Sequence, residues 1–452
     1  MGDKMDSYEN NRDLHTSTYK VLDVEPEYPD VHQIGNLFGK HITWEADGWK
    51  AIGESYFKSC YIHAGLSGAE ETFSGPDAEK LLSDFSINDV TKWKEGKCKH
   101  LVSLDEKGYV TNHALFYKDS PTQFRTTAGC SVPYLAAMQT GKYNVQYTTR
   151  NIFIFQLSGP TSLTIVEKAS QTNLHDVKFL QIVPLRMPGI DADLEFVRIG
   201  MSGTLSYEVH GPAEVGPAVY DKLYQIGKPM GMKRMGWKDY TINHTFGGNP
   251  QMTVNFESSL YADPQFTATA PFTPNYTGSI DPKNIEARFR TAVECRWDFM
   301  ARFNHDFLGR AALEAEMASP KRRVVSLVLN PDDIADVIRS QFTDDPYKYI
   351  DFPCAEQQPA GGHQDWVCDA DGSHIGISAN PTYSSHYKVM ISHAVIDVDK
   401  IEDGREVIIK WGDFGGKIKD IRATIAPFPY IHDVGDNRTF DTSKIASGLD
   451  AK

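Results

Sequence analysis

Residues 196–212 read F-V-R-I-G-M-S-G-T-L-S-Y-E-V-H-G-P, and this stretch decides how the fold is interpreted. Apolar and polar residues alternate on both sides of a run of small residues, which is typical of two β-strands joined by a turn. Glu208 lies between Tyr207 and Val209 in the second strand. Two interpretations stay open: Glu208 faces solvent, as most charged strand residues do, or its burial is compensated by two parallel N–H groups, such as the amidine-like edge of a pterin.

Length and composition indicate a globular protein with several domains. The chain has 452 residues, enough for roughly three domains, and 40% of them are hydrophobic. Its net charge of −14 argues against nucleic-acid and anionic-membrane partners, which need a basic surface. No apolar run reaches the ~18 residues of a membrane span, and the N-terminus lacks the apolar region of a signal peptide. We therefore expect a cytoplasmic protein.

Common metal sites and nucleophilic sites find no support in the sequence. The six cysteines are scattered without a CxxC pair, so they are expected to be reduced. His363, Cys368 and His374 are close in sequence, but their spacing matches no common zinc site, and no metal is predicted. Cys130 has no identifiable base beside it, so nucleophilic catalysis is not expected.

The spacing of apolar residues changes between helical and strand periods along the sequence, which predicts a chain with both α-helices and β-strands. Asp77 is expected to cap a helix that follows it, and residues 247–285, rich in Gly, Pro, Asn and Thr, are expected to form a long functional loop or linker. Further helices are expected at 44–57, 128–141, 162–169 and 213–226, a pair of strands at 100–117, and single strands at 151–157, 324–329, 389–398 and 406–411.

The segment 236–244, G-W-K-D-Y-T-I-N-H, places Tyr240, Asn243 and His244 directly before the Gly-rich loop. A phenol with a pKa near ~10 can protonate an oxyanion leaving group, which makes Tyr240 a candidate proton donor. The alternative is that Tyr240 and His244 only cap and pack the loop. The residues by themselves leave both open.

Four motifs in this order resemble the glycine-cleavage T-protein family. They are Q-L-S-G-P at 156–160, R-I-G-M-S-G-T-L-S-Y-E-V-H-G-P at 198–212, H-D-F-L-G-R at 305–310 and A-P-F-P-Y at 426–430. Within the family the chain is most similar to tetrahydrofolate-dependent aromatic O-demethylases of the vanillate, syringate and dicamba type. The resemblance covers roughly residues 40 to 432.

The resemblance implies an α+β fold, a three-domain cloverleaf with folate in a central channel and a mostly antiparallel β C-terminal domain. The domains it implies are a discontinuous folate-binding domain at 1–65 and 146–275, a small α/β domain at 66–145, and a C-terminal domain at 276–452 that is mostly β after about 320. It also implies the site residues: Glu208, Gln156, Arg198 and Tyr207 for the folate, Tyr240, His244 and His113 for catalysis, and Arg125, His63 and Asn243 for the substrate.

The sequence also departs from the family. The paired aspartate of T-proteins is missing from 108–113 (G-Y-V-T-N-H), so aminomethyl transfer is not expected. Thr127 stands where the vanillate-type enzymes carry a carboxylate-binding arginine, with Arg125 two residues earlier, and Asn249 replaces a family tryptophan. These changes leave the methyl donor open.

The function implied is transfer of a methyl group from a methoxylated aromatic acid to N5 of tetrahydrofolate, giving 5-methyl-tetrahydrofolate and a phenol. Tetrahydrofolate is the expected co-substrate, without a metal, and a monomer or small homo-oligomer is expected. Two alternatives remain: demethylation of a sulfonium or thioether-type substrate by the same cofactor, which needs no acid, and a folate-binding protein without catalysis.

Overall fold

The computed structural model describes residues 24–26, 28–37, 40–127, 131–269, 275–354, 362–431 and 437–449. The strands are β1 (Gln33–Leu37), β2 (Lys40–Glu45), β3 (Tyr61–His63), β4 (Gly68–Ser74), β5 (Lys97–Leu104), β6 (Val110–Ser120), β7 (Gln123–Thr126), β8 (Gln146–Ser158), β9 (Ile182–Leu185), β10 (Leu194–Val197), β11 (Ser206–Pro212), β12 (Lys233–Arg234), β13 (Arg322–Leu329), β14 (Gln364–Cys368), β15 (His374–Ser384), β16 (Val389–Asp397), β17 (Glu406–Trp411) and β18 (Lys419–Ala426). The α-helices are α2 (Trp49–Lys58), α3 (Ala78–Asp84), α4 (Val132–Gln139), α5 (Ser162–Ser170), α6 (Gly216–Gly227), α7 (Trp237–Gly247), α8 (Pro264–Thr269), α9 (Arg310–Ala318) and α10 (Pro331–Ser340).

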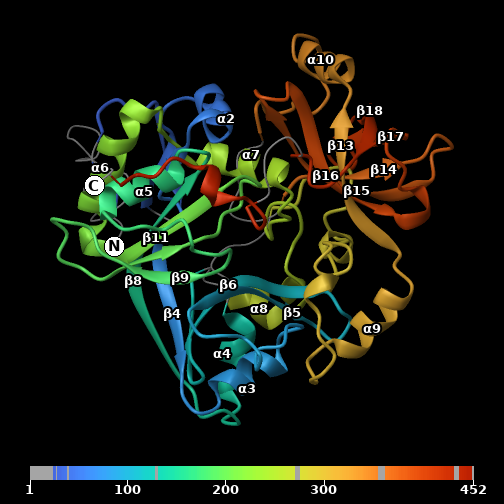
Figure 1. The fold of residues 1–452 in the computed structure, drawn as a ribbon. Helices are drawn as coiled ribbons and strands as arrows, with labels where there is room; N and C mark the ends of the chain where they lie inside the picture. Colours follow the sequence, from blue (N-terminus) through green and yellow to red (C-terminus); the bar gives the residue numbers. More distant parts are fainter. Residues whose placement is uncertain are drawn as a thin grey trace, which may run out of the picture.

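A ten-stranded sheet organises the N-terminal part of the chain (Figure 1). Its strands follow the order β5-β6-β7-β4-β8-β11-β10-β9, and β3 with β12 extends it beside β8. The sheet curls until its two ends meet: the Cys98 N–H donates to the Leu180 carbonyl at 2.9 Å, and the Ile182 N–H donates to the Gly96 carbonyl at 3.0 Å. The curled sheet therefore has an inner face that is screened from solvent.

The two faces of this sheet differ in chemistry. Along β11, Tyr207 and Val209 join a large apolar core that includes residues of α5 and α6, whereas Glu208 points to the opposite face because side chains alternate along a strand. Phe155 and Leu157 of β8 join the same core. Burying each such side chain contributes about 1.5–3 kcal/mol. A slip of one residue would exchange the faces, so this burial fixes the register.

The C-terminal part forms a closed barrel in the order β13-β16-β15-β14-β17-β18, to the right of the sheet in Figure 1. Its apolar interior holds β13 to β18 together, and α10 begins where the Asn330 side chain accepts from the backbone N–H groups of Asp332 and Asp333. Helix α7 reaches the barrel, since His393 of β16 donates from Nε2 to the Thr245 carbonyl at 2.7 Å. The barrel thus supports the helix that carries Tyr240.

Several expected elements have different bounds. The helix expected at 44–57 begins only at Trp49, because Gly48 adopts a φ of 86° after strand β2. Asp77 precedes α3 but makes no capping bond, and its carboxylate accepts from the Asn144 N–H at 2.8 Å instead. Tyr240 lies within α7 rather than beside a loop. The first residues of the helix expected at 128–141, including Cys130, lie outside the described residues.

The predicted boundary between the first two domains falls within a continuous sheet. Strand β8 pairs with β4 along 146–152 and with β3 and β11 toward its end. The division into domains stays a prediction. In the part of the chain that the structure covers, no helix combines the length and apolarity needed to cross a membrane, and no group of three His, Cys, Asp or Glu residues is arranged to hold a metal ion.

Candidate active site

One row of side chains crosses the inner face of the sheet. The strand registers pair His63 of β3 with Gln156 of β8, and Gln156 with Glu208 of β11. Neighbouring strands lie about 4.8 Å apart, so the row extends over about 10 Å. Three residues that are far apart in sequence therefore share one surface.

Hydrogen bonds orient the middle of this row. The Tyr61 hydroxyl donates to Gln156 Oε1 at 2.9 Å, which turns the Gln156 amide so that Nε2 donates to Glu208 Oε1 at 3.4 Å. On the other side of the carboxylate, His210 Nε2 donates to Glu208 Oε2 at 2.9 Å. The side chains form a chain in the order Tyr61, Gln156, Glu208, His210.

Glu208 is a buried carboxylate that can accept further hydrogen bonds. It is 4% exposed, so the solvent-facing interpretation of its strand position is wrong. An ionised carboxylate offers about four lone-pair positions, and Gln156 and His210 occupy one on each oxygen. The remaining positions can accept a pair of N–H groups from a ligand.

Tyr240 lies in an aromatic cluster at the His63 end of the row. Its ring stacks on His63 at 4.9 Å and on Trp237 at 5.0 Å between centroids, and it contacts the tilted ring of His244 at 4.0 Å. All three contacts belong to α7 and β3, so the packing of this helix onto the sheet builds the cluster.

Both histidines of the cluster are neutral near pH 7. Burial lowers the pKa of His63 and of His244 to about 4. His63 Nδ1 donates to the Met235 carbonyl at 3.1 Å, and His244 Nδ1 donates to the Tyr240 carbonyl at 2.9 Å. Because a neutral ring carries one proton, Nε2 of each is a bare acceptor.

The Tyr240 phenol holds its proton tightly. Burial raises its pKa, and the nearby charges of Glu208 and Tyr61 raise it further. No hydrogen bond contributes to this shift of the Tyr240 pKa. Tyr240 therefore keeps its proton and can donate a hydrogen bond at neutral and moderately alkaline pH.

Asn243 lies one turn along α7 and faces the same region. Its amide lowers the pKa of the Tyr61 phenol, whose overall shift is upward because of burial. The distances and angles are nevertheless too loose for a hydrogen bond, and both amide atoms are buried without a partner. Asn243 is thus a neighbour of Tyr61. Its expected contact with a substrate stays a prediction.

The structure also contains a cavity of about 1000 Å³, whose lining includes residues of β5 and β6 but not His63, Gln156 or Glu208. His113 lies in its wall, stacked between His100 at 4.9 Å and Trp297 at 4.0 Å. Burial lowers the pKa of His100 to about 4, while the Glu208 charge opposes this shift, which places His100 within electrostatic reach of Glu208. The structure thus places His113 in the cavity wall, whereas Tyr240 and His244 are not among its lining residues.

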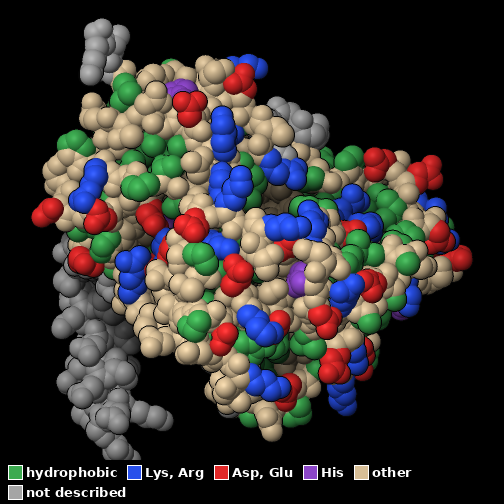
Figure 2. Space-filling model, turned by 60° about the horizontal axis from the view of Figure 1, so that its bottom comes forward, with side chains coloured by type: hydrophobic (Ala, Val, Ile, Leu, Met, Phe, Trp, Pro, Cys, Tyr) green, Lys and Arg blue, Asp and Glu red, His purple; other side chains and the backbone are tan. Residues whose placement is uncertain are grey.

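Basic side chains line this cavity although the whole chain is acidic. They are Lys92, Lys99, Arg296, Arg302 and Arg438. Figure 2 shows lysine and arginine side chains gathered around a hollow of the surface. The pKa of Lys99 is lowered, first by burial and also by the charge of Arg302, so an anion placed between them would relieve repulsion.

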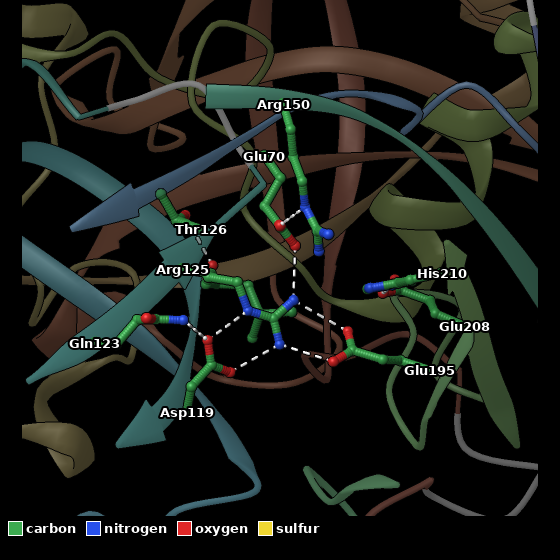
Figure 3. A network of polar contacts seen from close by, with 10 residues as sticks. Glu70, Asp119, Gln123, Arg125, Thr126, Arg150, Glu195, Glu208 and His210 are labelled. Carbon is green, nitrogen blue, oxygen red and sulfur yellow. Dashed lines mark hydrogen bonds and ion pairs between the residues drawn. The ribbon is translucent and has the colours of Figure 1, made fainter. Parts of the chain in front are cut away.

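Arg125 does not face this cavity. Its five N–H donors form five hydrogen bonds with Glu70, Asp119 and Glu195, at 2.7 to 3.0 Å (Figure 3). A guanidinium has five such donors in total, so none is left for a substrate carboxylate. Contrary to the prediction, Arg125 ties β4, β6, β7 and β10 together.

Two expected folate contacts also have structural roles. The Arg198 guanidinium donates to the carbonyls of Val177, Asn437 and Phe440 and so anchors the C-terminal segment. Tyr207 stacks on Phe196 at 4.8 Å in the apolar core, on the face opposite Glu208. Alternation along the strand turns Tyr207 away from the face that carries Glu208. The expected folate contacts of Arg198 and Tyr207 stay predictions.

Sequence reasoning missed His210, Tyr61 and Trp237. His210 was within reach of such reasoning, because residues two apart on a strand share a face and His210 follows Glu208 by two. Tyr61 and Trp237 carry no comparable signal, since only the packing of β3 and α7 brings them to the row.

Comparison with known proteins agrees with this architecture. Residues 67–242 match the model of the GCVT N-terminal domain. The chain is 31% identical over 426 residues to sesamin methylene transferase of Sinomonas sp., covering 89% of this chain and 93% of that protein. It is 28% identical over 422 residues to syringate O-demethylase of Sphingobium sp., covering 85% and 89%.

The fold has a solved counterpart. The glycine cleavage system aminomethyltransferase T from Bartonella henselae aligns with a TM-score of 0.65 over 90% of this chain and 96% of that chain, at 14% identity. This likeness confirms the expected fold class of mixed helices and antiparallel sheets with a β C-terminal domain. The sequence matches carry the relationship further: the chain belongs to the glycine-cleavage T-protein (GCVT) family and is an enzyme that transfers one-carbon groups.

Proposed function

We propose that the protein is a tetrahydrofolate-dependent O-demethylase that transfers a methyl group from a methoxylated aromatic acid to N5 of tetrahydrofolate. The buried Glu208 carboxylate carries this proposal, because it is oriented on both oxygens and keeps lone pairs for two parallel N–H groups. The pterin ring of folate presents such a pair along its amidine edge.

The residues around Glu208 fit a tetrahydropterin. Several buried polar atoms on this side of the sheet have no hydrogen-bond partner in the described structure, among them the Tyr117 hydroxyl and His210 Nδ1. Unsatisfied buried groups are costly, so they favour a polar ligand here. Burial raises the pKa of Tyr117, and the charge of Glu208 raises it further, which places the two groups within electrostatic reach of each other.

The basic cavity fits the opposite end of the same molecule. Folate ends in a glutamate with two carboxylates. In the described part of the chain, Lys99 donates to the Asp89 backbone carbonyl, and Arg302 donates to the backbone carbonyls of Phe299 and Ala301. A volume of about 1000 Å³ is at the upper end of the range for small-molecule sites. We assign the pterin to Glu208 and the glutamate to this cavity.

Tetrahydrofolate supplies the nucleophile N5, which lies on the side of the pterin away from the amidine edge. Glu208 would hold the amidine edge, and the row continues from Glu208 through Gln156 to His63, whose ring stacks on Tyr240. Holding both reactants at near-attack distance can contribute about 7–11 kcal/mol of the barrier. The sheet and α7 provide this alignment.

The leaving phenolate needs a hydrogen-bond donor, and we assign that role to Tyr240. His63 and His244 cannot donate from Nε2, because burial keeps both rings neutral and their single proton is on Nδ1. The raised pKa of Tyr240 makes full proton transfer from the resting phenol unfavourable. Tyr240 therefore stabilises the phenolate by donation, and the proton released from N5 finally replaces the methyl group on oxygen.

The decisive experiment incubates the protein with tetrahydrofolate and a panel of methyl donors, with 5-methyl-tetrahydrofolate measured by mass spectrometry. The panel contains methoxybenzoates, methoxyphenols without a carboxylate and a dimethylsulfonium compound. Product from the methoxybenzoates supports the proposal. Product from the sulfonium alone, or tetrahydrofolate binding without any product, would refute it in favour of the corresponding alternative.

A second candidate is transfer of a methylene group from a methylenedioxy aromatic compound. The similarity to sesamin methylene transferase over 93% of that protein favours it. Adding a methylenedioxybenzene to the panel separates the two, because methylene transfer gives 5,10-methylene-tetrahydrofolate whereas O-demethylation gives 5-methyl-tetrahydrofolate.

A further inference from the structure

We infer that His210 is the positioning residue that sets the orientation of the Glu208 carboxylate for its ligand. The inference rests on the proposed role of Glu208 as the pterin-binding carboxylate. It concerns the hydrogen bond that orients this carboxylate in the present chain.

The bond between the two side chains is short and shielded from water. His210 Nε2 lies 2.9 Å from Glu208 Oε2, and the two residues are 2% and 4% exposed. An ionised carboxylate only accepts, so Nε2 carries the proton and donates. Hydrogen bonds to a buried charged group are stronger than neutral ones.

The other partner of the carboxylate holds it less firmly. Gln156 Nε2 is 3.4 Å from Glu208 Oε1, which is near the limit of a hydrogen bond. His210 is therefore the stronger of the two groups that fix rotation about the last bond of the Glu208 side chain. Without it, the carboxylate plane is free to turn away from the direction in which two parallel N–H groups would meet it.

His210 is itself held by its surroundings. Its ring contacts the Tyr117 ring edge-on at 5.6 Å, and its strand neighbour is Glu195 of β10. Glu195 is fixed by Arg125 at 2.8 Å, and Figure 3 shows His210 and Glu208 beside this network. Among the described residues, the contacts of His210 thus include Glu208, Glu195 and Tyr117, with Arg125 paired to Glu195.

Three substitutions distinguish a donor at Nε2 from bulk alone. In His210→Gln the amide nitrogen reaches about as far as Nε2, whereas in His210→Asn the nitrogen falls near the position of Nδ1. His210→Phe keeps a ring and removes the donor. We expect His210→Gln to bind tetrahydrofolate within about threefold of the unchanged protein, and His210→Asn and His210→Phe to bind about 10- to 100-fold more weakly.

The measurements are the Kd of tetrahydrofolate by titration calorimetry and KM against kcat at saturating donor, all below the melting transition of each variant. We expect KM for tetrahydrofolate to rise while kcat changes less. A folate analogue with hydrogen in place of the 2-amino group should bind all four proteins with similar affinity, because it lacks one N–H of the pair. A purely structural role would weaken both ligands equally.

The Glu208→Ala variant tests the proposed function separately from the inference on His210. If the unchanged protein does not bind tetrahydrofolate, or if Glu208→Ala binds it equally well, the proposed function fails. If Glu208→Ala is weak but His210→Asn and His210→Phe bind normally, the inference on His210 is overturned. Equal losses in His210→Gln and His210→Asn would also overturn it, because the Gln donor should restore binding.

Discussion

Replacing Tyr240 by phenylalanine removes one hydroxyl from the proposed reaction centre and little else. The ring is packed by His63, Trp237 and His244, and these contacts persist in the Tyr240→Phe variant. The pKa shift of Tyr240 has no hydrogen-bond contribution, so we expect removal of the hydroxyl to leave the packing of the ring in place. We expect the melting temperature to change little.

The expected loss of turnover follows from the role of a single buried donor. Removing one donor to a developing oxyanion costs about 10²- to 10³-fold in kcat, or about 2.7–4 kcal/mol. Glu208 and His210 are not among the contacts of the Tyr240 ring, so the Kd of tetrahydrofolate should stay within about twofold, a shift of about 0.4 kcal/mol. We therefore predict that Tyr240→Phe lowers kcat and leaves the affinity for tetrahydrofolate nearly unchanged.

Single-turnover formation of 5-methyl-tetrahydrofolate, with Kd measured in parallel, tests this expectation. The pH profile gives an independent check: because burial raises the pKa of Tyr240 above its usual value of 10, no alkaline loss of activity up to pH 10 should come from this phenol. Equal losses in kcat and in folate affinity would refute the assigned role. So would an alkaline limb that disappears in Tyr240→Phe.

Three further predictions concern stability and charge. Asp239 is buried, and in the described structure neither of its carboxylate oxygens has a hydrogen-bond partner. Burial raises its pKa, and the charge of Glu45 raises it further. The protonated carboxyl therefore stabilises the fold fully below about pH 4, and this stabilisation is lost as the pH rises through the pKa of the folded protein. Asp239→Asn should match the unchanged protein at pH 4 and be more stable at pH 8, by about 1.4 kcal/mol for each pH unit between the two pKa values. Arg125→Met should destabilise by about 3–5 kcal/mol in urea titrations, since it leaves three carboxylates without their shared cation. Lys99→Ala combined with Arg302→Ala should raise the KM for tetrahydrofolate several-fold and weaken its dependence on salt.

Each of these has a contradicting result, and the double variant also has a matched control. An unchanged stability difference between pH 4 and pH 8 would contradict the burial argument for Asp239. For Arg125, the folded fraction of the variant should keep its kcat, and a specific loss of donor binding would restore the substrate role that the geometry denies. Lys92→Ala, a more exposed cation of the same cavity, is the control for the double variant, and an equal effect there would show a general charge effect.

Local sequence pattern was sufficient for part of the structure. The alternation in 196–212 predicted the two strands that became β10 and β11, and strand β17 was predicted with its bounds. The helix bounds near 44–57 could not be predicted, because a glycine with positive φ separates a strand from a helix whose residues have similar composition. Strand β15 and its bulge depend on barrel closure, which no local window contains.

For the site, the sequence by itself determined which residue types are available: a carboxylate in an apolar strand, a glutamine at the end of another, and a tyrosine among polar aromatics. Only the tertiary structure decided which of them meet. The strand registers align His63, Gln156 and Glu208, and the packing of α7 adds Tyr240. The tertiary structure also shows that Arg125 does not face the site, because carboxylates from three other strands compensate its charge. The reason is physical: chemistry belongs to single side chains, whereas burial, charge compensation and hydrogen-bond saturation depend on neighbours that are distant in sequence.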